Sequence, residues 1–68
     1  MYANLRKIIT ERNLSGAKLS RMADVSQSDF YMMMSGKKPA FPNWRKRIAE
    51  ALQMPEVEVF PEHNVKEG

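Results

Sequence analysis

The chain has 68 residues, of which 43% are apolar, and carries a net charge of +3 with one histidine and no cysteine. This length suffices for one small domain, and no apolar run approaches the roughly 18 residues that cross a bilayer. A zinc site, a disulfide framework and a thiol nucleophile are excluded, so we expect no metal, no cofactor and a fold held by helix packing alone.

The first two predicted helices follow from apolar spacing and capping residues. Apolar residues at helical spacing predict a helix from about Ala3 to Arg12. Asn13 tolerates the left-handed conformation and should end it. Ser15 is expected to cap a second, short helix. Its inward face should carry Leu19, Met22 and Ala23.

A third helix is predicted to begin at Ser26. Ser26 and Asp29 have the spacing of a capping box, in which Ser26 caps the Asp29 amide and the Asp29 carboxylate bonds the Ser26 amide. Gly36 should end the helix with a positive φ. Three consecutive methionines cannot share one buried face. We expect Phe30, Met33 and Met34 to be buried and Met32 to remain available for contacts.

The C-terminal third predicts two further helices. After a loop from Lys37 to Pro42, Asn43 is expected to cap a helix running to about Gln53. Its inward residues should be Trp44, Ile48, Ala51 and Leu52. Pro55 suits the start of a very short helix that Pro61 ends, with Met54, Val59 and Phe60 against the core. Residues 1–61 then form one domain, and residues 62–68 form a polar tail expected to be disordered.

The segment from Ala17 to Gly36 has the spacing of a helix-turn-helix. Two short helices are separated by a turn of three or four residues, and the second begins with small polar side chains that fit the major groove of B-DNA. The positions that must be apolar for the helices to cross are Leu19, Ala23, Val25, Phe30 and Met33. Ser20, at the crossing, is suitably small.

Four sequence blocks resemble those of a known family. These are Lys18-Leu19-Ser20, Val25-Ser26, Gly36-Lys37-Lys38-Pro39 and Ile48-Ala49-Glu50-Ala51-Leu52. From Leu5 to Phe60 the chain resembles the lambda-repressor-like helix-turn-helix family, also called Xre or Cro/C1. The resemblance implies an all-α, compact four- to five-helix DNA-binding domain, with the second and third helices forming the helix-turn-helix.

The chain departs from that family at several positions. Asp24 stands where a turn glycine is usual, Ser20 replaces an alanine, and Gly16 replaces a glutamine that supports phosphate or base contacts. Many members also carry an Arg and a Glu placed to form a partly buried ion pair. Here these positions are Ile9 and Met34. Because a buried ion pair can be replaced by packed apolar residues, we expect the two side chains to touch.

The resemblance also implies roles for individual residues. Residues facing base edges would be Ser26, Gln27, Ser28, Tyr31 and Met32. Among them, a glutamine amide can pair bidentately with adenine. Residues at the DNA backbone would be Ala17, Lys18, Lys37, Lys38 and Arg45. For the run from Arg45 to Arg47, solvation of a surface is an equal alternative.

Charge is distributed unevenly along the chain. Residues 1–47 contain ten Lys or Arg and three acidic residues, a net charge of +7, whereas the remainder has one Lys and five Glu, a net charge of −4. A basic surface of this kind suits a polyanion. The alternative is that the charges only solvate a small domain.

These patterns predict a sequence-specific, double-stranded-DNA-binding transcriptional regulator of prokaryotic or phage type, repressor-like, acting on an operator as a homodimer. The expected dimer surface consists of Trp44, Val57, Val59 and Phe60. No small-molecule ligand and no membrane contact are expected. Since the amphipathic start of the chain does not have the apolar block of a signal peptide, we expect a cytoplasmic, nucleoid-associated protein.

A different class of function is also compatible with the sequence. An antitoxin-like or anti-repressor module could keep the fold and use the third helix against a protein. Tyr31, the methionines and the missing glutamine at Gly16 favour this alternative. An enzyme is not expected, because the only histidine is His63, in the tail, and the carboxylates cluster in the last third without a facing partner.

Overall fold

The computed structural model describes residues 2–63 of the chain. This part contains five α-helices, a final 3-10 turn and no strand, which confirms the all-α class. The elements are α1 (Ala3–Glu11), α2 (Gly16–Met22), α3 (Gln27–Ser35), α4 (Pro42–Leu52), α5 (Glu56–Val59) and the turn η1 (Pro61–His63). The predicted tail begins at Glu62, inside η1, and residues 64–68 lie outside the described part.

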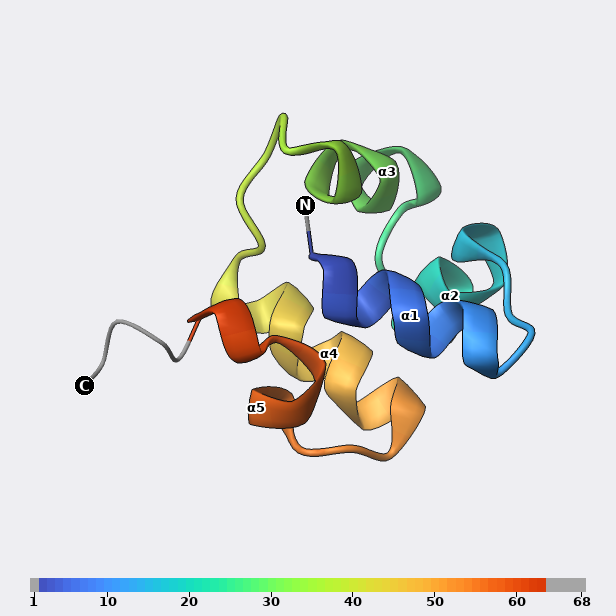
Figure 1. The fold of residues 1–68 in the computed structure, drawn as a ribbon. Helices are drawn as coiled ribbons and strands as arrows, with labels where there is room; N and C mark the ends of the chain where they lie inside the picture. The colour runs from blue at the N-terminus through green and yellow to red at the C-terminus, as the bar shows by residue number, and fades with distance from the viewer. Residues whose placement is uncertain (1, 64–68) are drawn as a thin grey trace.

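The helices are arranged around α1. Figure 1 shows α1 in the middle of the molecule, with α3 on one side and α4 and α5 on the other. The short helix α2 packs against both α3 and α4, and α5 packs against α4 and α1. The segment that joins α3 to α4 runs along the outside of the molecule (Figure 1). This arrangement leaves one side of α3 uncovered by other helices.

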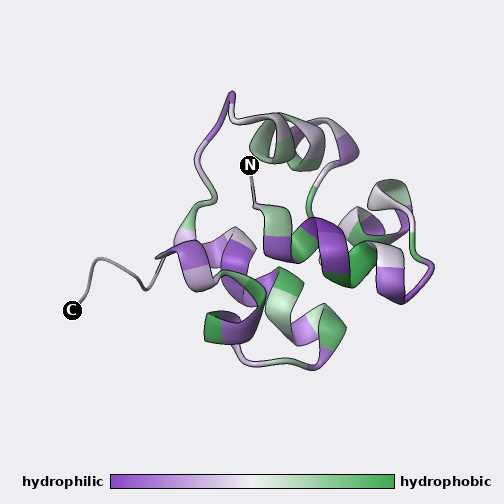
Figure 2. Cartoon of the chain, viewed as in Figure 1, coloured by the Kyte–Doolittle hydropathy of each residue, from purple (hydrophilic) through white to green (hydrophobic). Residues whose placement is uncertain are grey.

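The core is formed by apolar side chains from all five helices. Its fully buried members are Leu5, Leu19, Phe30, Met33, Ile48, Leu52, Val59 and Phe60. Tyr2 closes one end, because its ring packs edge-on against Phe60 at 5.6 Å and its hydroxyl accepts from the Ala40 amide at 3.2 Å. Figure 2 shows hydrophobic and hydrophilic residues interspersed along the helices, whereas the segment after α3 is hydrophilic at its apex.

The predicted caps of α2 and α3 are confirmed. The Ser15 hydroxyl accepts from the Lys18 amide at 3.0 Å, and the Ser26 hydroxyl accepts from the Asp29 amide at 3.1 Å. Each bond satisfies one of the amides that a helix start leaves without a partner. The left-handed residues are also as expected, with φ of 57° at Asn13 and 90° at Gly36.

Two local predictions are wrong. Helix α4 begins at Pro42, with Phe41 as its N-cap, so Asn43 lies inside the helix and caps nothing. Proline suits this position because its fixed φ and missing N–H match the first helical residue. Met22 is 47% exposed, since the inner face of α2 is completed by Ser20 instead. In α4, Ala51 is partly buried and packs against the core as predicted, and Ala49, which was not among the predicted inward residues, is buried as well.

The predicted dimer surface also needs correction. Val59 and Phe60 are both 0% exposed, because α5 turns them inward against α4 and α1. They therefore contribute to the core of one chain and offer no surface to a second. Trp44 is half-buried, and Val57 is 51% exposed.

Candidate nucleic-acid interface

Four residues, Ala23–Ser26, connect α2 to α3. The turn is closed by the Val25 amide, which donates to the Ser20 carbonyl at 2.9 Å, and by a left-handed residue, Asp24, with φ of 59°. This is the hydrogen-bond pattern of a helix end that reverses through a left-handed residue. Because aspartate tolerates that region better than most residues, the substitution for glycine leaves the turn intact.

Ser20 lies where α2 packs against its neighbours and is completely buried. Its hydroxyl donates to the Ala17 carbonyl at 2.8 Å, within the same helix. A buried hydroxyl with a partner carries little penalty. The residue thus keeps the helix crossing close without leaving a buried polar atom unpaired.

The exposed face of α3 begins at its first turn. Gln27 and Ser28 are exposed, and neither side chain has a hydrogen-bond partner within residues 2–63. Tyr31 is 47% exposed, whereas Met32 is half-buried. Ser26 differs from the others because its hydroxyl is engaged as the cap. The structure therefore places Ser26, Gln27 and Ser28 together at the start of α3, whereas Tyr31 and Met32 lie one turn further along, with Tyr31 against Gly16.

Three arginines stabilise the ends of helices. Arg6 donates to the Met34 carbonyl at 3.2 Å, at the end of α3. Arg12 donates to the Leu52 carbonyl at 2.8 Å, at the end of α4. Arg47 donates to the carbonyl of Asp24, just after α2, at 3.2 Å. The last carbonyls of a helix have no partner within it and carry partial negative charge, so a guanidinium suits them.

Arg45, predicted to contact DNA backbone, is half-buried and is bonded within the protein. Its Nε bonds the Glu56 carboxylate at 2.7 Å, and its Nη1 donates to the Ala40 carbonyl. These bonds tie the start of α4 to α5 and to the preceding loop. The assignment to phosphate is therefore corrected, because the guanidinium already has a carboxylate and a carbonyl as partners.

Lys38 reaches back from the loop to the first turn of α3. Its Nζ lies 2.9 Å from Oδ1 of Asp29. The hydrogen bond from Lys38 holds the pKa of the Asp29 carboxyl below its ordinary value, and the Ser26 hydroxyl acts in the same direction. The predicted bond from this carboxylate to the Ser26 amide is replaced by the ion pair. The charge of Lys38 is thus already offset by Asp29 within the protein.

Five basic residues in residues 2–63 have neither an acidic partner nor a side-chain hydrogen bond. They are Lys7, Lys18, Arg21, Lys37 and Lys46. Lys18 and Arg21 are three residues apart in α2 and so lie on one side of that helix. Lys37 directly follows α3. Ala17 is half-buried, and its carbonyl accepts from Ser20.

Arg21 is a candidate that sequence reasoning missed. It lines an open hollow of about 520 Å³ together with Gln27, at the junction of α2 and α3. The helical spacing from Lys18 was the signal that could have found it. A free guanidinium therefore lies beside the residue with the strongest predicted role in base recognition.

The described residues show neither a metal site nor a membrane span. No group of three His, Cys, Asp or Glu side chains in residues 2–63 could hold a metal ion. No helix in that range has the length and apolar character needed to cross a membrane.

Comparisons with known proteins do not assign the chain to a family. No family model, no curated protein and no solved structure matches it. The resemblance to the lambda-repressor-like family rests on the sequence blocks quoted above. Functional inference accordingly depends on the geometry of α2, α3 and their free cations.

Proposed function

We propose that the chain is a sequence-specific DNA-binding protein in which α2 and α3 form a helix-turn-helix and α3 enters the major groove. The observation that carries this proposal is the start of α3. Gln27 and Ser28 are exposed there without a hydrogen-bond partner among residues 2–63, beside the guanidinium of Arg21, which has no partner in that range either. The major groove admits an α-helix and displays the donors and acceptors that such side chains bind.

The turn between α2 and α3 supports the proposal. A four-residue connection with a left-handed residue joins two packed short helices, as a helix-turn-helix requires. Ser20 keeps their crossing close. The sequence resemblance to the lambda-repressor-like family points the same way.

The free cations supply the sequence-independent part of binding. Lys18 and Arg21 belong to α2, and Lys37 follows the last turn of α3, so cations stand at both ends of the proposed recognition helix. Each phosphate that they neutralise releases counterions, which makes the affinity fall with salt. Arg6, Arg12, Arg45 and Arg47 have roles in the fold and are not assigned to DNA.

We further propose that the protein acts as a homodimeric, repressor-like regulator on paired half-sites, in the cytoplasm with the nucleoid. Phe41 and Val57 are 44% and 51% exposed, and the Phe41 ring packs edge-on against Trp44 at 4.7 Å. The Arg45–Glu56 ion pair holds the start of α4 beside α5. This apolar surface replaces the predicted one that included Val59 and Phe60. Sedimentation showing only a monomer at high micromolar concentration, free and on DNA, would contradict the dimer.

Selection of bound sequences from random duplex DNA, followed by fluorescence anisotropy at several salt concentrations, tests the main proposal. For Gln27→Ala we expect a loss of preference at one base pair of about 1–3 kcal/mol. Lys18→Gln should weaken binding to all sequences alike and lower the log–log salt slope by about 1. Lys46→Gln, on α4, is the matched control and should change neither. Absence of salt-dependent duplex binding would refute the proposal.

A protein-interaction module is the second candidate. Met22 on α2 and Tyr31 on α3 are each 47% exposed, which is more apolar surface than reading DNA requires. Such surface favours a protein partner. If α3 binds protein, complex formation should depend weakly on salt and duplex DNA should not compete for it. Salt dependence thus separates the two functions.

A further inference from the structure

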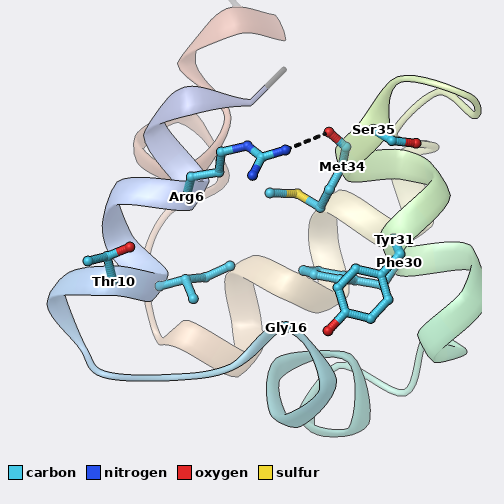
Figure 3. A pocket seen from close by; sticks show the side chains of 8 residues that line it. Arg6, Thr10, Gly16, Phe30, Tyr31, Met34 and Ser35 are labelled. Atoms are coloured by element: carbon cyan, nitrogen blue, oxygen red, sulfur yellow. Dashed lines mark hydrogen bonds between the residues drawn. The ribbon is translucent and has the colours of Figure 1, made fainter.

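A cavity of about 440 Å³, open to solvent on one side, lies between α1, the start of α2 and α3 (Figure 3). This volume falls within the range of about 300–1,000 Å³ that small-molecule sites occupy. The residues that matter for its chemistry are Arg6, Ile9, Gly16, Phe30, Tyr31 and Met34. The cavity is separate from the exposed start of α3, where Gln27 and Ser28 lie.

The walls of the cavity are mainly apolar. Ile9 comes from α1, and Phe30 and Met34 come from α3, where both are buried against the core. Ile9 and Met34 occupy the two positions at which the resembled family often carries an ion pair. Both line this cavity, whereas their direct contact stays a prediction. An aromatic ring placed here would meet the edge of Phe30 and the Met34 sulfur, which are favourable neighbours for it.

Polar groups stand at opposite ends of the cavity. Figure 3 shows the Arg6 guanidinium at one end, where it bonds the Met34 carbonyl, and the Tyr31 hydroxyl at the other end, beside Gly16. A guanidinium offers a planar fork of donors that matches a carboxylate. One cation beside an apolar wall is the combination that selects a small amphipathic anion.

Gly16 explains how Tyr31 comes to line the cavity. A Cβ at this position would lie 3.0 Å from both Cε1 and Oη of Tyr31 and 3.2 Å from Cε2 of Phe30. The tyrosine ring therefore rests directly against the backbone of α2, in space that any larger residue would fill. Its ring is also edge-on to Phe30 at 5.9 Å. Because Tyr31 is half exposed, its ring forms the part of the wall that borders solvent.

We propose that this cavity binds a small aromatic carboxylic acid, with its ring among Ile9, Phe30 and Met34 and its carboxylate on Arg6. Ligand binding would displace Tyr31 and change the packing of α3 against α2. An effect of this change on DNA binding rests on the proposed function. The sequence alone predicts no small-molecule ligand. The reason for the difference is that Arg6, Gly16 and Tyr31 are distant in the sequence and line one hollow only in the folded chain.

A titration of the ¹⁵N-labelled protein with 2-naphthoate, followed by NMR, tests the site. We expect saturable shifts at the amides of Gly16, Tyr31 and Met34. The neutral analogue 2-naphthamide should bind at least several-fold more weakly, because it offers no charge to Arg6. Scattered or non-saturating shifts, or equal affinity for the two compounds, would overturn the proposal. These measurements use the unaltered protein and need no DNA, so DNA binding and the cavity site can fail separately.

Variants at Arg6 and Lys7 test which positive charge binds the carboxylate of the ligand. Arg6→Gln should reduce 2-naphthoate affinity about tenfold and leave 2-naphthamide unchanged, whereas Arg6→Lys should retain part of the difference. Lys7→Gln removes a neighbouring charge outside the cavity and should have little effect. Equal losses in Arg6→Gln and Lys7→Gln would show attraction to net charge alone and contradict the site. If Arg6→Gln unfolds, the comparison of the two naphthalene compounds still decides the matter.

Discussion

Arg12, the C-cap of α1, donates from its Nη1 to the carbonyl of Leu52, the last residue of α4, across 2.8 Å. This bond joins the ends of two helices that are 40 residues apart in sequence. Arg6 and Arg47 make equivalent bonds to the ends of α3 and α2. These three arginines therefore stabilise the fold.

Removal of the Arg12 bond should destabilise the protein. We expect Arg12→Ala to lower the free energy of unfolding by about 1 kcal/mol, since a charged hydrogen bond to a partly buried carbonyl is lost. Urea denaturation measures this change. Arg21→Ala, which removes an exposed arginine without partners, should stay within about 0.5 kcal/mol. Equal effects of the two substitutions would contradict a role for Arg12 in stability.

The Ser26 cap should contribute about as much to the free energy of unfolding as the Arg12 bond does. Ser26→Ala leaves the Asp29 amide without its partner and is expected to cost about 1 kcal/mol of unfolding free energy. Ser28→Ala, two residues later on the exposed face, is the control and should have little effect on stability. If thermal and urea unfolding of the two variants coincide, the hydroxyl of Ser26 does not cap α3.

The left-handed conformation of Asp24 predicts a stabilising substitution. Asp24→Gly should raise the free energy of unfolding by up to about 1 kcal/mol, because glycine adopts φ near 59° without a steric penalty. Asp24→Val should lower it, since a branched side chain fits that region poorly. The same glycine substitution at Lys7, an exposed residue inside α1, should be destabilising by about 1 kcal/mol. A loss of stability in Asp24→Gly would argue against strain in the turn.

The Lys38–Asp29 pair predicts a specific acid dependence. The pKa of Asp29 is lowered in the folded protein, so its contribution is complete above the ordinary carboxyl pKa of about 3.9 and is lost as pH falls through the lower folded value. Stability measured from pH 5 down to pH 2 should fall less steeply in Asp29→Asn than in the unaltered protein. Lys38→Gln should flatten the curve in the same way. If stability falls equally between pH 5 and pH 2 in all three proteins, the ion pair does not contribute to the free energy of unfolding.

The same pair also affects the proposed DNA binding. Asp29→Asn removes a negative charge from the first turn of α3 and releases Lys38, so affinity for duplex DNA should rise several-fold at low salt. Lys37→Gln should weaken binding more than Lys38→Gln, because the charge of Lys38 is already offset by Asp29. Anisotropy titrations of the three variants give the order. Weaker binding by Asp29→Asn would indicate that this carboxylate contacts the DNA or supports the helix that does.

Local features of the fold could be predicted from the sequence because both partners are close along the chain. Ser15, Ser26 and Gly36 act within three or four residues of themselves, and their roles are confirmed. Gln27 and Ser28 were predicted to be exposed on the first turn of α3, and they are. Their role in binding stays a prediction.

Contacts between distant residues could not be predicted in this way. The bond from Arg6 to Met34 spans 28 residues, and the pair of Arg45 and Glu56 depends on how α5 folds back. A basic residue in a sequence shows its charge but not its partner. Val59 illustrates the same limit for apolar residues. From the sequence alone, an apolar side chain fits the core of one chain as well as an interface with a second chain.

The described cations divide by residue type. Four arginines bond carbonyls or carboxylates within the protein, whereas four of the five cations without partners are lysines. In the proposed function, polyanion contact would therefore draw mainly on lysines together with Arg21, and folding on the other arginines. Reagents that acetylate lysine would test this separation directly, since they should weaken affinity for polyanions while helix content persists.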